Sequence, residues 1–295
     1  MLDFRVDTFL TVCQTMNFTR AAEILHITQP AVSQHIKALE AQYGTKLFTY
    51  VGKQLALTEA GKLFLQTAIT IHHDDCHLRD AIQQLRKTRR LNFGATLTIG
   101  QYVMPTALIG LLNKEPETQL RMIMGNTEKL LALLDQGEID FALVEGFFSQ
   151  QCYESLSYGR ERYIPVCASE YQFCQPVRRI EDLLGERLLV REPGSGTREV
   201  LERALEEHHL SLQDFHLLTE LGSLDVIKTL VCAGVGISFF YFPVVKAQLE
   251  EGCLREIPLE NCTITHDFHF IWRKDSAFGT YYQQAFQMLK GEERG

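Results

Sequence analysis

Residues 18–59 constrain the fold of this chain most strongly, because they contain the local signals of two short helices joined by a tight turn. The first helix is predicted from a short amphipathic run that holds Ala21, Ala22, Ile24 and Leu25. The run is interrupted at residues 26–28, where Thr28 can cap a second helix. Pro30 lies beside Gln29 in the first turn of that helix, where a missing amide hydrogen costs nothing. The stretch therefore predicts a helix-turn-helix.

The second helix has two chemically different faces. Val32, Ile36 and Leu39 recur at helical spacing and predict the face that packs against a core. The other face carries amide, hydroxyl and ammonium groups, on Gln29, Ser33, Gln34 and Lys37. Such groups can pair with base edges in the major groove and contact phosphate. A polar surface on an ordinary helical hairpin is the alternative, and the agreement of cap, proline and split faces argues against it.

A first helix and a two-stranded wing complete the predicted N-terminal domain. Apolar residues at helical spacing predict the helix over residues 3–16. Leu55 and Leu57 alternate with smaller or polar residues on one side of a turn at Gly52. This pattern predicts a hairpin with Lys53 at its tip.

A long helix over residues 59–88 is expected next, opened by Thr58 and Glu59. Its apolar positions follow heptad-like steps of four and three, with Asp75 as the one interruption, at Phe64, Ala68, Ile71, Leu78, Ile82 and Leu85. Such a seam predicts pairing with a second copy of the chain. Two recognition helices would then meet two half-sites of a roughly palindromic operator.

The histidines and cysteines give weak signals. His73 and His77 of the run 72–77 are spaced to share a metal, but no third ligand stands at a matching spacing, so solvated polar residues on an exposed helix are the preferred interpretation. The eight cysteines form no C-x-x-C pair and are expected to be reduced, buried, small hydrophobic residues. No metal or cofactor is predicted, and a redox-sensing pair has no support in the spacing.

The composition, 45% hydrophobic and 22% charged, is that of a soluble globular protein of two or three domains. No apolar run approaches the roughly 18 residues needed to cross a bilayer, and no secretory signal follows Met1, so we expect a cytoplasmic location and no membrane partner. The net charge of −8 is unevenly distributed. Residues 1–90 hold 11 Lys and Arg against 8 Asp and Glu, and the remainder holds 18 against 29. Double-stranded DNA is therefore a partner for the N-terminal part alone.

From residue 96 the pattern alternates between strand and helix, after a boundary in the run 87–94. The first unit has strands at 97–99, 120–124 and 141–144 with helices at 103–113 and 127–136. The second has strands at 188–190, 216–219 and 236–239 with helices at 197–208 and 224–233, and a strand at 268–272 and a helix at 278–290 return to the first. This alternation predicts parallel strands covered by helices on both faces. Two α/β lobes joined by crossing strands near 161–167 and 264–268 would enclose a ligand cleft. One continuous sheet without a cleft is the alternative.

Polar clusters lie where the predicted strands meet helices, and each can direct backbone amides and a side chain at the cleft. They are Gly100-Gln101-Tyr102, Gly125-Asn126-Thr127, Glu145-Gly146 and Pro193-Gly194-Ser195-Gly196-Thr197-Arg198, with Ser223 as a further candidate that can also simply cap the next helix. The helix start at Ser195 to Arg198 favours an anion, so an acidic or phosphorylated metabolite is expected. A glycine-rich turn that binds nothing is the alternative. No phosphate loop and no nucleophile elbow is present.

The whole chain resembles the LysR-type transcriptional regulators. The residues that carry the resemblance are 18–23 (Phe-Thr-Arg-Ala-Ala-Glu), 28–33 (Thr-Gln-Pro-Ala-Val-Ser), Leu39-Glu40, Leu47-Phe48 and 57–61 (Leu-Thr-Glu-Ala-Gly). The resemblance implies a winged helix-turn-helix over 1–58, a dimerising linker helix over 59–90 and a two-lobed effector domain, similar to periplasmic binding proteins, over 91–295. Lobe I would hold about 91–162 and 268–295, and lobe II about 163–267. It also implies a homodimer or homotetramer that bends DNA in response to a small effector.

Carried over by motif position, the DNA-contacting residues would be Thr28, Gln29, Pro30, Ser33, Gln34, Lys37 and, in the minor groove, Lys53. The wing departs from the usual Leu-Phe-x-Arg, because Tyr50 stands where the family has a phosphate-binding arginine. Residues 125–127, 143–146 and 191–198 resemble the branch that governs sulfur and carbon assimilation. Gln101 stands where many members have Ser or Thr.

Two other functional classes share part of this pattern. A solute-binding protein with a vestigial helical head would share the two lobes, but its export would require a signal segment. An enzyme would require a nucleophile and base, a metal set or a cofactor fingerprint, and the clusters contain none of these. We therefore expect a regulator rather than an enzyme.

Overall fold

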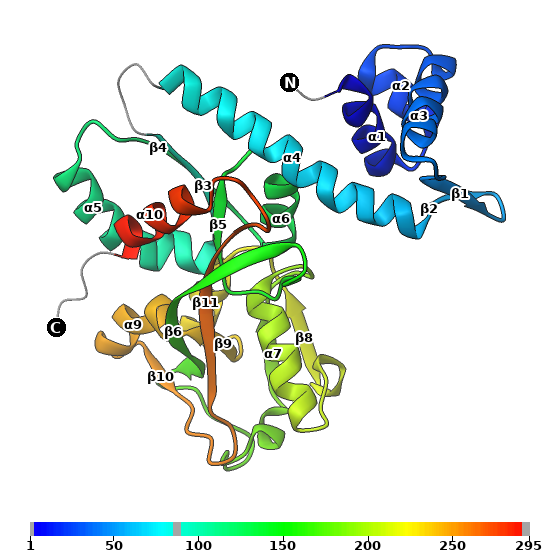
Figure 1. The fold of residues 1–295 in the computed structure, drawn as a ribbon. Coiled ribbons are helices and arrows are strands. Elements are labelled where there is room, and N and C mark those ends of the chain that lie inside the picture. The colour runs from blue at the N-terminus through cyan, green and yellow to red at the C-terminus, as the bar shows by residue number, and fades with distance from the viewer. Residues whose placement is uncertain (1–2, 85–89, 291–295) are drawn as a thin grey trace. The chain divides into compact units, whose positions relative to one another are not determined.

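The computed structural model describes residues 3–84 and 90–290 and divides into two compact units. One unit comprises Met1–Arg86 with the short segments Asp135–Glu138 and Arg273–Gly279. The other comprises Lys87–Leu134, Ile139–Trp272 and Thr280–Gly295. Figure 1 shows their elements, and each unit is described by itself. Within the described residues, no helix is long and apolar enough to cross a membrane.

The first unit begins with three helices, α1 (Phe4–Thr15), α2 (Phe18–Leu25) and α3 (Gln29–Tyr43). Their buried faces form one core, which contains Phe9, Val12, Ala21, Ala22, Val32, Ile36, Leu39, Leu47 and Phe48. The predicted buried face of α3 is confirmed. The predicted helix α2 packs mainly through its two alanines, whereas Ile24 is 54% exposed and points away from the core.

Local caps fix the helix-turn-helix. The Thr28 hydroxyl accepts a hydrogen bond from the Ala31 amide at 3.4 Å, and Pro30 lies in the first turn of α3, as predicted. Asn17 caps α2 in the same way, accepting from the amides of Thr19 and Arg20. His26 ends α2 with a φ of 55°, in the left-handed region. The turn between the helices is thus determined by the sequence around it.

The predicted wing is present as β1 (Phe48–Val51) paired antiparallel with β2 (Gln54–Leu57). Gly52 turns the hairpin with a φ of +64°, which glycine adopts without strain, and Lys53 follows it at the tip. At the base, the buried Glu40 carboxylate accepts from the Leu47 amide at 3.0 Å and from Lys46 Nζ at 2.6 Å. This carboxylate therefore anchors the wing to α3.

Helix α4 (Glu59–Gln84) contains the predicted heptad seam, but the seam divides into two parts. Phe64 packs edge-on against Phe9 within the N-terminal core, and Ala68 is buried. The later positions, Ile71, Leu78 and Ile82, are 47%, 45% and 57% exposed and form an apolar stripe. Asp75 pairs with Arg79 at 2.5 Å. The last predicted seam residue, Leu85, lies outside the described residues.

The interpretation of residues 72–77 as solvated is wrong for two histidines. His73 is 1% exposed and His77 is 9% exposed, because residues 273–279 and 135–138 pack on that face of α4. The His77 ring meets Phe278 edge-on at 4.3 Å. Asp74 accepts hydrogen bonds from the Ser276 hydroxyl and the Ala277 amide. In the part of the chain that the structure describes, no three His, Cys, Asp or Glu side chains gather closely enough to hold a metal ion.

The second unit is built on a seven-stranded sheet with the order β10-β6-β11-β5-β3-β4, to which β9 adds by pairing with β6. The strands are β3 (Arg90–Thr96), β4 (Gln119–Gly125), β5 (Phe141–Val144), β6 (Tyr153–Ala168), β9 (Ser238–Tyr241), β10 (Leu254–Glu256) and β11 (Ile264–Arg273). Strand β3 runs parallel to both β4 and β5, as predicted, whereas β11 runs antiparallel to β5. The helices α5 (Met104–Lys114), α6 (Thr127–Asp135) and α10 (Gly279–Lys290) belong to lobe I.

The predicted position of the first strand is wrong. Residues 90–96 form β3, and Ile99–Val103, which the pattern assigned partly to a strand, form a π-helical turn, η1. Asn92 and Gly94 interrupt the apolar run and disguise the strand. Gly94 is required there, because a Cβ would lie 2.6 Å from Leu130 Cδ2, on the helix that covers β3.

Lobe II contains β7 (Arg187–Val190) paired parallel with β8 (Leu217–Glu220), together with α7 (Gly196–Glu207), α8 (Leu224–Cys232) and α9 (Phe242–Glu250). The sequence did not reveal α9 or β10. The crossing strands β6 and β11 lie next to each other in the seven-stranded sheet and are longer than predicted. Hydrogen bonding is therefore continuous between the lobes, and the residue that follows β5, Gly146, lies against Gly196 at the start of α7.

Candidate functional site

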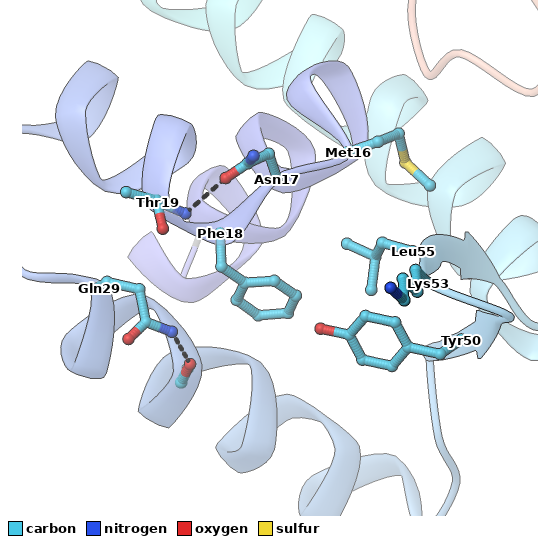
Figure 2. A pocket seen from close by; sticks show the side chains of 9 residues that line it. Met16, Asn17, Phe18, Thr19, Gln29, Tyr50, Lys53 and Leu55 are labelled. Carbon is cyan, nitrogen blue, oxygen red and sulfur yellow. Dashed lines mark hydrogen bonds between the residues drawn. The ribbon is translucent and has the colours of Figure 1, made fainter.

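The N-terminal candidate site is a hollow between α2, the start of α3 and the wing, with a volume of about 350 Å³. Figure 2 shows the side chains that line it, which are Met16, Asn17, Phe18, Thr19, Gln29, Ser33, Tyr50, Lys53 and Leu55. Polar groups from the recognition helix and a cation from the wing thus share one concave surface. Of the other predicted DNA-contacting residues, Thr28, Pro30, Gln34 and Lys37 are all exposed.

Within this hollow, Gln29 Nε2 donates to Ser33 Oγ at 2.8 Å, which orients both side chains on one face of α3. Tyr50 is 67% exposed, and its hydroxyl is directed toward the Phe18 ring (Figure 2). A phenol at this place can donate a hydrogen bond but does not supply the cation that an arginine would. Lys53 is therefore the one cationic side chain among the residues that line the hollow.

The second candidate site surrounds a buried carboxylate in the effector domain. Glu145, at the end of β5, is 2% exposed. Its carboxylate accepts hydrogen bonds from the hydroxyl of Thr96, at the end of β3, and from that of Thr197 in the first turn of α7, the latter at 3.1 Å. Burial raises the pKa of Glu145, while the two hydroxyls and the charge of Arg191 partly oppose that rise. Residues of both lobes thus meet at one ionisable group.

Two glycines allow the lobes to approach at this point. A Cβ on Gly196 would lie 2.5 Å from the Gly146 nitrogen, and one on Gly146 would lie 2.4 Å from Thr127 Oγ1. Thr127 starts α6 and Gly196 starts α7, so the amino-terminal ends of two helices converge beside Glu145. Partial positive charge at these ends favours an anionic group. Thr127 Oγ1 is buried without a hydrogen-bond partner among the described residues.

A second contact joins the lobes through Tyr102. Its hydroxyl donates to Asp225 Oδ1 at 2.8 Å and accepts from Lys228 Nζ at 2.8 Å, both on α8. The lysine also lies 4.9 Å from the centre of the Tyr102 ring. Tyr102, one of the predicted effector-binding residues, thus faces lobe II, and its hydroxyl is engaged by protein groups.

The remaining predicted effector residues lie apart from this cluster or already have partners. Ser223 accepts from the Val226 amide and caps α8, which is the structural alternative considered for it. Asn126 accepts from the Lys129 amide. Arg198 pairs with Glu202 at 2.8 Å and with Glu220 at 2.5 Å. The charge of its guanidinium is therefore already balanced by two carboxylates. Gln101, another predicted effector residue, is exposed.

Beside the start of α7 lies a further hollow of about 380 Å³. It is lined by Thr127, Glu128, Leu131, Phe147, Pro193, Gly194, Ser195, Arg198, Glu199 and Glu202. Three glutamates and one arginine line this hollow, so the net charge of its lining is negative. Ser195 is 3% exposed and makes no side-chain cap bond to α7.

Sequence reasoning missed Thr96, Arg191, Asp225 and Lys228. Thr96 is the last residue of β3, and the sequence pattern predicts the first strand only after it. Asp225 and Lys228 stand three residues apart on a predicted helix, which is a signal for a shared face but not for what that face contacts. Arg191 is 4% exposed and binds Glu192 through two nitrogens, at 2.7 and 2.8 Å.

Two family models match the chain over nearly its whole length. One, described as the bacterial regulatory helix-turn-helix protein of the lysR family, matches residues 5–62, and the LysR substrate binding domain matches residues 85–294. The chain belongs to the LysR family. It is thus a LysR-type DNA-binding transcriptional regulator with an effector-binding domain, not an enzyme.

Curated relatives of this LysR-type chain include regulators of the RuBisCO and CbbR type. The HTH-type transcriptional regulator CfxR of Cupriavidus necator is 33% identical, over 88% of this chain and 82% of that protein. CbbR of Rhodospirillum rubrum is 29% identical, over 97% and 95%. A probable RuBisCO transcriptional regulator of Thalassiosira pseudonana is 27% identical, over 94% of both. The resemblance to a sulfur and carbon branch is thus supported on its carbon side only.

Solved structures show the same fold. A full-length OxyR variant from Pseudomonas aeruginosa has a TM-score of 0.59 at 22% identity and covers 98% of both chains. Full-length LysG from Corynebacterium glutamicum with bound effector Arg has a TM-score of 0.63 at 17% identity, also over 98% of both. The winged helix-turn-helix, the long helix α4 and the two-lobed α/β domain expected from the sequence are confirmed.

Proposed function

We propose that this LysR-type regulator binds a specific operator through the exposed face of α3 and the wing, and that a small metabolite held between its two lobes modulates the binding. The observation that carries the proposal is the shared concave surface of Gln29, Ser33 and Lys53. Thr28 and Pro30 would hold the start of α3 against the DNA backbone, Gln34 would read base edges, and Lys37 would contact phosphate. The domain limits proposed are 1–58, 59–90 and 91–295.

We propose a homodimer, or a homotetramer built from it, as the form that binds DNA. The support is the stripe of Ile71, Leu78 and Ile82 on α4, to which Leu63, 69% exposed, adds a fourth large apolar side chain. Pairing of two such helices would remove the stripe from water and set two recognition helices side by side. The cytoplasm remains the proposed location.

The salt dependence of DNA binding tests the first part of the proposal. Affinity for the DNA that precedes the regulator's own gene is expected to fall steeply between a low and a high salt concentration, because released counterions drive the binding. Lys53→Ala should weaken binding similarly on all sequences and lower the salt slope by about 1 for each recognition unit. Equal affinity for random DNA, or affinity independent of salt, would contradict sequence-specific operator binding.

The effector is proposed to be a small anion that competes with Glu145. The hydroxyls of Thr96 and Thr197 already hold a carboxylate, and the starts of α6 and α7 converge beside it. An oxyanion of similar size would find the same donors if Glu145 gave them up. Protonation of Glu145 would assist, because a neutral carboxyl group does not repel an anion. The three glutamates near α7 favour a second candidate, a cationic effector.

Substitution of Glu145 by glutamine separates the two candidates. With sulfate as the probe, whose charge is constant over the range, affinity of the natural protein is expected to rise as pH falls from roughly 8 to 5, because burial raises the Glu145 pKa. Glu145→Gln should bind sulfate more tightly at neutral pH and lose the pH dependence. Isothermal calorimetry measures the sulfate affinity and its dependence on pH. Free arginine serves as the cationic probe. Weaker binding of sulfate to the variant, together with loss of arginine binding, would instead support the cationic effector.

The same variant has a consequence for stability. Because the raised pKa means that the folded state holds its proton more tightly than the unfolded state, the free energy of unfolding should fall as pH rises through that pKa. Glu145→Gln removes this part of the slope, and each unit of pKa difference corresponds to about 1.4 kcal/mol. Glu154→Gln, on an exposed part of β6, is the matched control and should leave the pH profile unchanged.

A further inference from the structure

No disulfide joins any of the eight cysteines, and the expectation that they are buried is wrong, because Cys167 alone among them is buried. Two of the others lie close together on the surface of lobe II. Cys232 is the last residue of α8, and Cys253 lies in the turn between α9 and β10. Their Sγ atoms are 3.7 Å apart. Cys253 is exposed and Cys232 is half-buried, so an oxidant in solvent can reach one sulfur while the other stands beside it.

We propose that Cys232 and Cys253 form a reversible, redox-sensitive disulfide, with hydrogen peroxide as the oxidant. A disulfide requires a sulfur separation of about 2.0 Å, so the two sulfurs, now 3.7 Å apart, need only a small approach to bond. The backbone around Cys253 is already fixed on both sides. Its amide donates to the Gln248 carbonyl at 3.1 Å, and its carbonyl accepts from the Ser169 amide at 3.1 Å.

The exposure of the two thiols sets the order of the reaction. The Cys253 thiolate attacks one oxygen of the peroxide, the O–O bond breaks, and the departing hydroxide takes up a proton to form water. The Cys232 sulfur then attacks the sulfenic sulfur of Cys253 and loses its proton, the S–O bond breaks, and a second water leaves. Each thiol is oxidised by one electron, and the peroxide is reduced by two.

The acidity of Cys232 agrees with its role as the second thiol. Burial, together with the neighbouring Cys253 thiol, raises the pKa of Cys232 to about 11. At neutral pH it is therefore a protonated thiol and a poor first nucleophile for peroxide. Lys228, one turn earlier on α8, acts in the opposite direction. The proximity of Cys232 to an activated sulfur, rather than its own acidity, makes it reactive.

The crosslink would act on an element that joins the lobes. Helix α8 ends at Cys232 and carries Asp225 and Lys228, which hold the Tyr102 hydroxyl of lobe I. A covalent bond from the end of α8 to the turn before β10 restricts the helix from its far end. Oxidation therefore alters the same part of lobe II that contacts lobe I, and it does so without occupying the effector site.

The test is peptide mapping of the reduced full-length protein after treatment with hydrogen peroxide and alkylation. We expect the number of alkylatable thiols to fall by two per chain, a peptide pair linked through Cys232 and Cys253, and full reversal by dithiothreitol. The oxidised protein should also melt about 5–10 °C higher than the reduced one, because the bond closes a loop of intermediate length.

Three single variants make the result decisive. Cys253→Ser should abolish the crosslink and the thermal shift, and Cys232→Ser should trap Cys253 as a sulfenic acid that dimedone labels. Cys174→Ser changes another exposed cysteine and should behave like the natural protein. Oxidation of Cys253 to the sulfinic acid in the natural protein without a crosslink would overturn the proposal, as would a crosslink that survives in Cys253→Ser.

Discussion

Gly196→Ala is expected to lower the free energy of unfolding of the effector domain by about 3 kcal/mol and to abolish its response to effector. The new methyl carbon would lie 2.5 Å from the Gly146 nitrogen and 2.6 Å from the Gly146 Cα. Both are backbone atoms, which cannot turn away as a flexible side chain can. The start of α7 must therefore move away from the end of β5, and the hydrogen bond from Thr197 to Glu145 is lost with it.

Thermal and urea denaturation measure the first effect, and calorimetry with the sulfate probe measures the second. Gly110→Ala is the matched control, because Gly110 lies in α5 and a Cβ there meets nothing within 4 Å. Alanine also favours a helix over glycine by roughly 1 kcal/mol, so the control should be neutral or more stable. If Gly196→Ala were as stable as Gly110→Ala and bound the probe equally well, the close contact between the lobes would not exist in solution.

The parts of the fold that the sequence predicted well are those fixed by neighbours along the chain. Thr28 caps α3 through an amide three residues away, and Gly52 turns the wing between adjacent strands. The alternation of strands and helices in the effector domain was equally local. Such features depend on a few consecutive residues, so a pattern read along the chain contains most of the information.

The errors arose where distant residues decide the environment. His73 and His77 resemble solvated residues until residues 273–279 are placed against α4. The predicted first strand lies too far along the chain, because Asn92 and Gly94 break the apolar run of β3. Gly94 has no side chain and so leaves space for Leu130. In both cases the deciding contact comes from a segment far along the chain, which periodicity cannot show.

The same limit applied to the candidate effector site. Glu145 and Thr197 were both predicted to line a cleft, yet the sequence did not indicate that they bond to each other or that Thr96 completes the cluster. Arg198 was predicted to bind an anion from its place at a helix start. In the structure its guanidinium pairs with Glu202, one turn later, and with Glu220, on β8. A helix-spacing rule identifies the first partner but not the second.

Gln34→Glu is expected to weaken operator binding by about 2–4 kcal/mol, or roughly 30- to 1000-fold in the dissociation constant. Gln34 is exposed on the polar face of α3, one position from Ser33 and opposite the buried Ile36. The substitution keeps the size of the side chain but replaces an amide, which can donate to a base edge, by a carboxylate beside a polyanion. Loss of a donor and repulsion by phosphate therefore act in the same direction, and added salt should relieve only the repulsion.

Gln42→Glu makes the same chemical change near the other end of α3, and it distinguishes a DNA contact from a general effect of charge. Gln42 accepts a hydrogen bond from Arg5 at 3.5 Å, so the added charge there has a cation nearby. Fluorescence anisotropy with operator and random DNA should show a loss for Gln34→Glu that is far larger on the operator, and a small, sequence-independent loss for Gln42→Glu. Circular dichroism should show both variants folded to within about 0.5 kcal/mol of the natural protein, since both sites are on the surface. Equal losses in the two variants would mean that the polar face of α3 does not read bases, because the field of an added charge would then explain the whole effect.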